Sequence, residues 1–295
     1  MLHALRRGIF AAALLSMALP TVAAISVQDD MRHAVTLAAP AQRIVSLAPH
    51  TTELLFAAGA GSKIVGISEY SDYPAAARSI ASIGSSAALD LERILALKPD
   101  LIVSWGSGNL GPQVGKLREL GIPVFESEPR DFDTVATSLE RLAQLAGTTA
   151  VGQQAASQFR SRLAQLSATY AQRPTVTVFY QVWRDPLMTL NDAHLVSSVI
   201  RLCGGQNIFG KLPTLVPTVN VEALMQADPE VILAGSSADD PKYDWRRFGR
   251  LKAVVRGNLF TLNSDQMTRP GPRILDGADA MCRHLESARA KRGQY

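Results

Sequence analysis

The chain has 295 residues, a formal net charge of +4 and two cysteines. Its small positive excess is spread along the sequence rather than gathered in one patch, so nucleic acid is not an expected partner. Beyond the N-terminus no stretch is long and apolar enough for a membrane span, so the mature protein is not expected to be inserted in a membrane.

The first 24 residues have the pattern of a signal peptide. Arg6 and Arg7 supply a short positive region, residues 8–19 are apolar, and Thr21–Ala24 offers small residues for cleavage. The apolar run is about a dozen residues long, whereas a membrane span needs roughly 20; an uncleaved N-terminal anchor is the alternative. Export predicts a periplasmic protein, and a mature chain of about 270 residues suits two lobes.

Short β-branched runs alternate with longer amphipathic segments along the rest of the chain. The expected strands are Ile44–Leu47, Ile64–Ile67, Leu101–Trp105, Val124–Glu126, Thr175–Tyr180, Val231–Ala234 and Leu259–Leu262. The expected helices are Thr51–Ala58, Asp90–Leu97, Leu110–Leu120, Phe132–Leu145, Val196–Leu202 and Glu222–Ala227. This alternation predicts an α/β protein with parallel sheets covered by helices.

An internal echo favours two related lobes. Residues 91–103 parallel residues 221–233: in each, a glutamate (Glu92 or Glu222) opens a short helix, a proline follows seven residues later, and an apolar strand comes next. The glutamate suits the positive end of the helix dipole, and the proline ends the helix before the strand. One such match could also be the common sequence pattern of a helix followed by a strand, but a Gly-rich helix end shared by both halves adds to the case for duplication.

Residues 149–172 are expected to form one long helix between the halves, with apolar residues at a spacing of three to four. Some 20 helical residues span about 30 Å, enough to bridge two lobes as a stiff strut. A surface helix of the first lobe is the alternative. The predicted organisation is a signal peptide at 1–24, an N-terminal α/β lobe at 25–148, a linking helix at 149–172 and a C-terminal α/β lobe at 173–295.

Common signatures of enzymes and metal sites are missing from the sequence. It contains no HxH, HExxH, P-loop or GxSxG pattern, and a metal site would need three or four converging ligands. We therefore expect neither enzyme activity nor a bound cofactor or metal. A periplasmic enzyme with a scattered Ser–His–Asp set is the alternative from another functional class.

Aromatic and polar residues follow four of the expected strands. These segments are Tyr70–Pro74, Trp105–Asn109, Trp183–Pro186 and Asp265–Pro270. Open α/β sheets bind ligands at the carboxyl ends of their strands. A cleft with tyrosine and tryptophan faces and a few polar groups suits a large, partly apolar, amide-fringed molecule. Packing in the core is the alternative for each aromatic residue taken singly.

The two cysteines, Cys203 and Cys282, both lie in the C-terminal half. In an oxidising compartment such a pair favours one disulfide, and two buried free thiols are the alternative.

Five segments together resemble the periplasmic vitamin B12-binding proteins of cobalamin ABC importers. They are Arg43–Glu53, Tyr70–Pro74, Leu91–Trp105, Cys203–Phe209 and Ser264–Ile274, and the resemblance covers nearly all of the mature chain. It implies two Rossmann-like lobes with parallel sheets joined by a single long α-helix. It also implies a corrinoid such as cobalamin held between the lobes as transported ligand, and a monomer that works with an inner-membrane ABC permease/ATPase complex.

The resemblance also implies roles for individual residues. It places Tyr70 and Trp105 on the N-lobe side of the cleft, Pro49 in a cleft-lining turn, and Asp265, Gln266, Met267, Thr268 and Arg269 in a loop on the C-lobe side. Asp265 and Arg269 would bind peripheral groups of the ligand, and Trp183 would supply part of the stacking surface. Cys203 and Cys282 match the disulfide of the family. Glu92 and Glu222 match one docking carboxylate per lobe, each meeting arginines of the permease; simple helix-start carboxylates are the alternative.

The sequence departs from the family at several cleft positions. Ser86 and Val216 stand where tryptophans are usual, and Gln266 and Met267 replace aromatic residues. A variant corrinoid, haem or a ferric siderophore is therefore an alternative ligand. His50 follows Pro49 where a small residue is usual, and its imidazole is expected either to reach the ligand, including its metal, or to lie solvated at the start of a helix.

Overall fold

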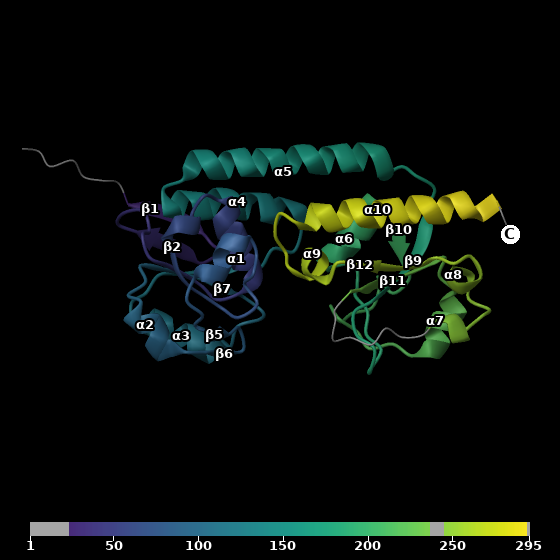
Figure 1. Cartoon of the computed structure of the whole chain (residues 1–295), viewed down its shortest axis with the longest axis horizontal. Coiled ribbons are helices and arrows are strands. Elements are labelled where there is room, and N and C mark those ends of the chain that lie inside the picture. Colours follow the sequence, from purple (N-terminus) through teal and green to yellow (C-terminus); the bar gives the residue numbers. More distant parts are fainter. Residues whose placement is uncertain (1–23, 237–244, 294–295) are drawn as a thin grey trace, which may run out of the picture.

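We describe residues 24–236 and 245–293 from a computed structural model of the chain (Figure 1). The predicted signal peptide lies outside these residues except for Ala24. None of the helices in this part of the chain combines the length and apolar character that a membrane span requires.

The N-terminal lobe is built on a four-stranded parallel sheet with the order β4-β3-β7-β8. Its strands are β3 (Ile44–Ser46), β4 (Ile64–Ile67), β7 (Leu101–Trp105) and β8 (Val124–Ser127). Its helices are α1 (Pro49–Ala57), α2 (Leu91–Ala96), α3 (Gly111–Glu119) and α4 (Phe132–Ala146). Two antiparallel ribbons complete the lobe, β1 (Ile25–Gln28) with β2 (Ala34–Leu37) and β5 (Gly84–Ser85) with β6 (Ala88–Leu89).

The C-terminal lobe repeats this plan with a second parallel sheet, in the order β10-β9-β11-β12. Its strands are β9 (Val176–Gln181), β10 (Gly205–Asn207), β11 (Val231–Gly235) and β12 (Leu259–Leu262). Its helices are α6 (Leu195–Leu202), α7 (Val221–Ala227), α8 (Lys252–Val255), α9 (Ser264–Thr268) and α10 (Ile274–Ala290). The predicted fold class is therefore confirmed. Strand β10 was not among the expected strands, because it has only three residues, Gly205, Gln206 and Asn207, and none of them carries an apolar side chain.

Helix α5 (Thr149–Tyr170) runs along one side of both lobes, beside α4 and α10 (Figure 1). Its closest approach to α4 depends on Gly152, where an added Cβ would lie 2.2 Å from the Cβ of Ala143. The buried stripe therefore includes Gly152, Ala156 and Phe159. Val151, one of the apolar residues of this helix, is 48% exposed, because small residues let the two helices meet on the neighbouring side. A core that includes Leu54 and Leu285 extends through both lobes.

Side-chain caps explain why the two echoed helices begin where they do. Asp90 accepts a hydrogen bond from the backbone N–H of Arg93 at the start of α2, and Asn220 accepts one from Ala223 at the start of α7. A cap of this kind satisfies one of the backbone donors that a helix start leaves without a partner.

The predicted disulfide between Cys203 and Cys282 is present. Both cysteines are fully buried, and the bond joins the end of α6 to α10. The alternative of two free thiols is therefore wrong.

Candidate functional site

A cleft of about 520 Å³ lies between the two lobes. The N-terminal lobe lines it with Trp105, Ser107 and residues 128–130. The residues with which the C-terminal lobe lines it are Asn191, Ala193, His194, Leu195, Pro213, Leu215, Val216, Met267, Thr268 and Pro270. The residues of the walls come at or after the ends of strands β7, β8, β9, β10 and β12 in the chain. The cleft therefore lies beyond the carboxyl ends of the strands, where ligand sites are expected in open α/β sheets.

Trp105 forms the aromatic part of the N-lobe wall, and the loop after it is built to hold it. The Trp105 backbone N–H donates to Asn109 Oδ1 (2.6 Å), while Asn109 Nδ2 donates to the carbonyls of Leu47 (3.1 Å) and Ser86 (2.8 Å). A Cβ on Gly108 would lie 1.9 Å from the Trp105 ring, so only glycine fits beneath it. Gly108 thus gives the tryptophan ring its place against the loop.

His50 lies behind Trp105, with its ring centroid 5.5 Å from that of the tryptophan in an edge-to-face arrangement. It is 2% exposed, and burial lowers its pKa to about 3 despite a hydrogen bond with the Ser127 backbone. Its Nε2 has no hydrogen-bond partner among the described residues. Neither expectation for His50 fits, because the imidazole is not solvated and does not line the cleft. It supports the tryptophan from inside the lobe.

Met267 and Thr268 from α9 form part of the opposite wall. Asn263 caps this helix through the backbone N–H of Gln266, and Gly277 of α10 lets Met267 approach closely. Val216 also lines the cleft. The position at which the resemblance implies a tryptophan in other members of the family therefore lies on the cleft wall.

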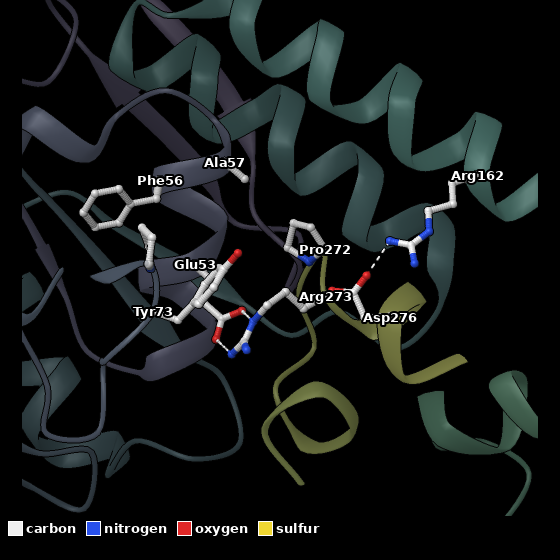
Figure 2. A pocket seen from close by; sticks show the side chains of 9 residues that line it. Glu53, Phe56, Ala57, Tyr73, Arg162, Pro272, Arg273 and Asp276 are labelled. Carbon is white, nitrogen blue, oxygen red and sulfur yellow. Dashed lines mark hydrogen bonds and ion pairs between the residues drawn. The ribbon is translucent and has the colours of Figure 1, made fainter. Parts of the chain in front are cut away.

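Asp265 and Arg269 take part in an ion network between the lobes. Arg269 Nη1 lies 3.2 Å from Glu53 Oε1 and 2.7 Å from Asp72 Oδ1, and its Nη2 lies 3.0 Å from Asp265 Oδ1. Arg273 donates two hydrogen bonds to Glu53, of 2.8 Å and 2.5 Å (Figure 2). Burial favours the neutral acid at Asp72, but the hydrogen bond and charge of Arg269 outweigh it and lower the Asp72 pKa.

Four other residues predicted to lie at the ligand site, Tyr70, Trp183, Pro49 and Gln266, are not among the described residues that line the cleft. Tyr70 is 79% exposed, has a positive φ of 63° and lies in a separate shallow hollow whose members include Asp72. Trp183 is 51% exposed and donates its Nε1–H to the Asp185 carbonyl. Pro49 is the first residue of α1 and is partly buried, and Gln266 is held at the start of α9.

Glu92 and Glu222 are both exposed in the first turn of their helices. Helices α2 and α7 lie on the side of the molecule away from α5, one in each lobe (Figure 1). Each lobe thus carries one of these exposed glutamates on a helix of that side.

Sequence reasoning missed the part of the cleft formed by residues 191–195. Asn191 and His194 lie between β9 and α6, and His194 is the N-cap of α6. A polar residue directly before an apolar helical pattern is a helix-start signal, but nothing in the local sequence shows that its side chain reaches a ligand site.

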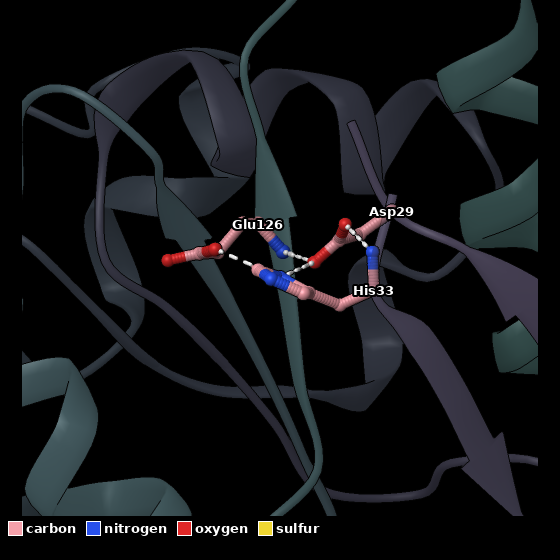
Figure 3. A group of neighbouring side chains, drawn as sticks. All are labelled: Asp29, His33 and Glu126. Atoms are coloured by element: carbon pink, nitrogen blue, oxygen red, sulfur yellow. Dashed lines mark hydrogen bonds and ion pairs between the residues drawn. The ribbon is translucent and has the colours of Figure 1, made fainter. Parts of the chain in front are cut away.

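Asp29, His33 and Glu126 form a small cluster that joins the β1–β2 turn to β8 (Figure 3). Their potential ligand atoms lie within 4.8 Å of one another. Asp29, however, already accepts hydrogen bonds from the backbone of Met31, His33 and Glu126, and Glu126 is paired with Arg118 at 3.1 Å. The cluster is explained by attachment of the ribbon to the sheet.

A family model described as periplasmic binding protein matches residues 44–265. The chain belongs to this family. The vitamin B12-binding protein of Vibrio cholerae is 40% identical over 250 residues, which are 84% of this chain and 91% of that protein. The vitamin B12-binding protein of Yersinia pestis is 39% identical over 84% of this chain and 87% of that protein.

Solved structures of this family agree with the fold. The crystal structure of the periplasmic vitamin B12 binding protein BtuF of Vibrio cholerae matches with a TM-score of 0.79 and 39% identity, covering 85% of this chain and 98% of that one. The periplasmic heme binding protein HutB of the same organism matches with a TM-score of 0.73 at 19% identity, covering 83% and 98%. At that identity the match to HutB shows the shared fold alone.

Proposed function

We propose that this periplasmic binding protein captures cobalamin or a related corrinoid in the cleft between its lobes and delivers it to an ABC permease of the inner membrane. The observation that carries the proposal is a cleft with walls from both lobes and Trp105 on one of them, in a chain 40% identical to a vitamin B12-binding protein.

The chemistry of the walls suits such a ligand. Trp105 and Pro129 on one side, and Val216, Met267 and Pro270 on the other, offer apolar surface for a macrocycle. Polar groups among them can bind amide side chains at its edge. Because α5, a shared core and the ion network all connect the lobes, the cleft is largely formed before the ligand arrives, which lowers the cost of binding.

Delivery requires a surface that the permease can recognise. Glu92 and Glu222 fit this role, since exposed carboxylates pair strongly with arginines and a two-lobed protein can present one to each half of a two-fold symmetric partner.

Titration calorimetry of the mature chain with cyanocobalamin, haemin and a ferric hydroxamate tests the proposal. We expect cyanocobalamin to bind and Trp105→Ala to weaken it by about ten- to a hundredfold, because a buried tryptophan contributes a large apolar face. Trp183→Ala is the matched control, expected to leave the affinity unchanged because Trp183 lies outside the described cleft walls. Preferential binding of haemin or the hydroxamate would favour a ligand of that class, and turnover of ester or phosphate substrates would favour an enzyme.

A further inference from the structure

His194 occupies a defined place at the start of α6, on the C-lobe wall of the cleft. The backbone before it is fixed by Asn191, whose Oδ1 accepts from the Ala193 N–H (3.0 Å) and whose Nδ2 donates to the Leu212 carbonyl (3.0 Å). Ser197 Oγ, from the first turn of α6, donates to the Asn191 carbonyl (2.7 Å). The imidazole is therefore held by the fold rather than by a ligand.

The cap determines which nitrogen of His194 carries the proton. Nδ1 accepts a hydrogen bond from the backbone N–H of Val196 at 3.1 Å. A neutral imidazole has one donor and one acceptor nitrogen, so the hydrogen must be on Nε2. Burial lowers the pKa of His194 to about 4, which keeps the ring neutral near pH 7.

The Nε2 atom of His194 has no hydrogen-bond partner in the described part of the chain, and it is not fully buried. The atom is therefore accessible, and the residue that carries it lines the cleft. An accessible donor with a fixed direction on the wall of a binding cleft is suited to recognise an acceptor on the ligand.

We propose that the Nε2–H of His194 donates a hydrogen bond to an oxygen of the bound ligand, either an amide carbonyl or a phosphate oxygen. The inference rests on the proposed function of the cleft and adds a specificity residue to it. A ligand without an oxygen at this position leaves the donor unpaired in a desolvated site, and it is rejected for that reason.

The same geometry excludes a different role for this histidine. Coordination of a cobalt or iron atom requires a free lone pair on the ligating nitrogen, and Nε2 has none while Nδ1 caps α6. His194 would have to change tautomer and lose the cap to bind a metal. It therefore selects the periphery of a ligand rather than its metal centre.

Two substitutions separate the two nitrogens. In His194→Asn the side-chain amide reaches the position of Nδ1, so the cap is retained and the donor in the cleft is lost. In His194→Gln the longer amide reaches the position of Nε2, so the donor is retained and the cap is lost. Calorimetry with cyanocobalamin measures what the Nε2–H donor contributes to affinity, and urea denaturation of the ligand-free protein measures what the Nδ1 cap contributes to stability.

We expect His194→Asn to weaken cyanocobalamin binding about three- to tenfold, the loss of one hydrogen bond, with an unchanged urea midpoint. We expect His194→Gln to bind within about twofold of wild type and to unfold at lower urea. Dicyanocobinamide, which lacks the nucleotide phosphate, identifies the acceptor: a penalty that persists indicates a ring amide, and one that disappears indicates the phosphate.

Wild-type affinity in His194→Asn, with wild-type protein binding cyanocobalamin, would overturn the donor role and leave the proposed function intact. Equal losses of affinity in both variants would overturn it as well, since the cap would then be the relevant contact. If the wild-type protein binds no corrinoid, the proposed function itself fails, and the donor role fails with it.

Discussion

Glu53 joins two arginines of the C-terminal lobe in the ion network between the lobes. Its side chain is 2% exposed, and its carboxylate accepts two hydrogen bonds from Arg273 and one from Arg269, both of which come from the C-terminal lobe. Replacement by alanine removes the common partner of two guanidinium groups. The side chains of Arg269 and Arg273 are only 11% and 16% exposed, so water can replace little of what they lose.

The expected cost of Glu53→Ala follows from what each arginine retains. Arg269 keeps its ion pairs with Asp72 and Asp265, whereas Arg273 loses its ion pair and keeps the ring of Tyr73, 4.0 Å from its guanidinium carbon, and the charge interaction with Asp265. Breaking a buried ion pair costs about 3–5 kcal/mol, mostly because a buried charge is left uncompensated. Since one arginine remains compensated, we expect the free energy of unfolding to fall by about 3 kcal/mol.

Urea denaturation followed by circular dichroism measures this loss, and one transition is expected because a single core includes residues of both lobes. Asp276→Asn is the matched control: it removes the ion pair with Arg162, which lies near Arg273 and Glu53 (Figure 2), but the side chains of Asp276 and Arg162 are 40% and 44% exposed. An exposed pair contributes less than about 1 kcal/mol. Adding Arg273→Met to Glu53→Ala should recover much of the stability, because the uncompensated charge is gone. If Glu53→Ala costs no more than Asp276→Asn, the network does not stabilise the junction.

Two further predictions concern the docking surface and the response to acid. Glu92→Lys and Glu222→Lys should leave cyanocobalamin affinity unchanged but abolish ligand-stimulated ATPase activity of the reconstituted importer; normal stimulation by the double variant would refute the docking role. The folded-state pKa values of His50 and His194, about 3 and about 4, lie below the unfolded value of 6.5. As the pH is lowered, the unfolded chain therefore binds protons before the folded chain does. The stability that the two neutral histidines provide is present above pH 6.5 and is lost as the pH falls, by up to about 2.7 kcal/mol per pH unit for the two together between roughly pH 6 and 4. His194→Asn should reduce the slope measured by urea denaturation by up to about 1.4 kcal/mol per pH unit, and an unchanged slope would contradict the burial of the imidazole.

Much of the fold could be predicted because its signals are local. Helix starts at Asp90 and Asn220 have capping residues, and β-branched runs identify strands such as β7 and β11. The disulfide followed from compartment and cysteine count. Strand β10 could not be found, since Gly205–Asn207 has no apolar pattern and is a strand only because it pairs with β9.

The site was harder to predict because its members meet only after folding. Position after a strand pointed to both Trp105 and Trp183, and it gave no means of telling that Trp105 lines the cleft whereas Trp183 is not among its lining residues. Arg269 was expected to bind ligand, whereas Glu53 and Asp72, distant in sequence, engage its guanidinium across the lobe boundary. His50 offered no sign that burial behind a tryptophan would keep it neutral.

These contacts indicate where ligand selectivity must arise. Helix α5, the shared core and the Glu53 network each connect the lobes independently, so the width of the cleft is a property of the fold. Discrimination between ligands then depends on what the walls present at fixed positions. Val216 presents a small apolar surface where the resembling family has a tryptophan, which leaves more room on the C-lobe wall. With less stacking surface available, a directed donor such as His194 carries a larger share of the recognition, since hydrogen bonds distinguish ligands of equal size more sharply than apolar contacts do.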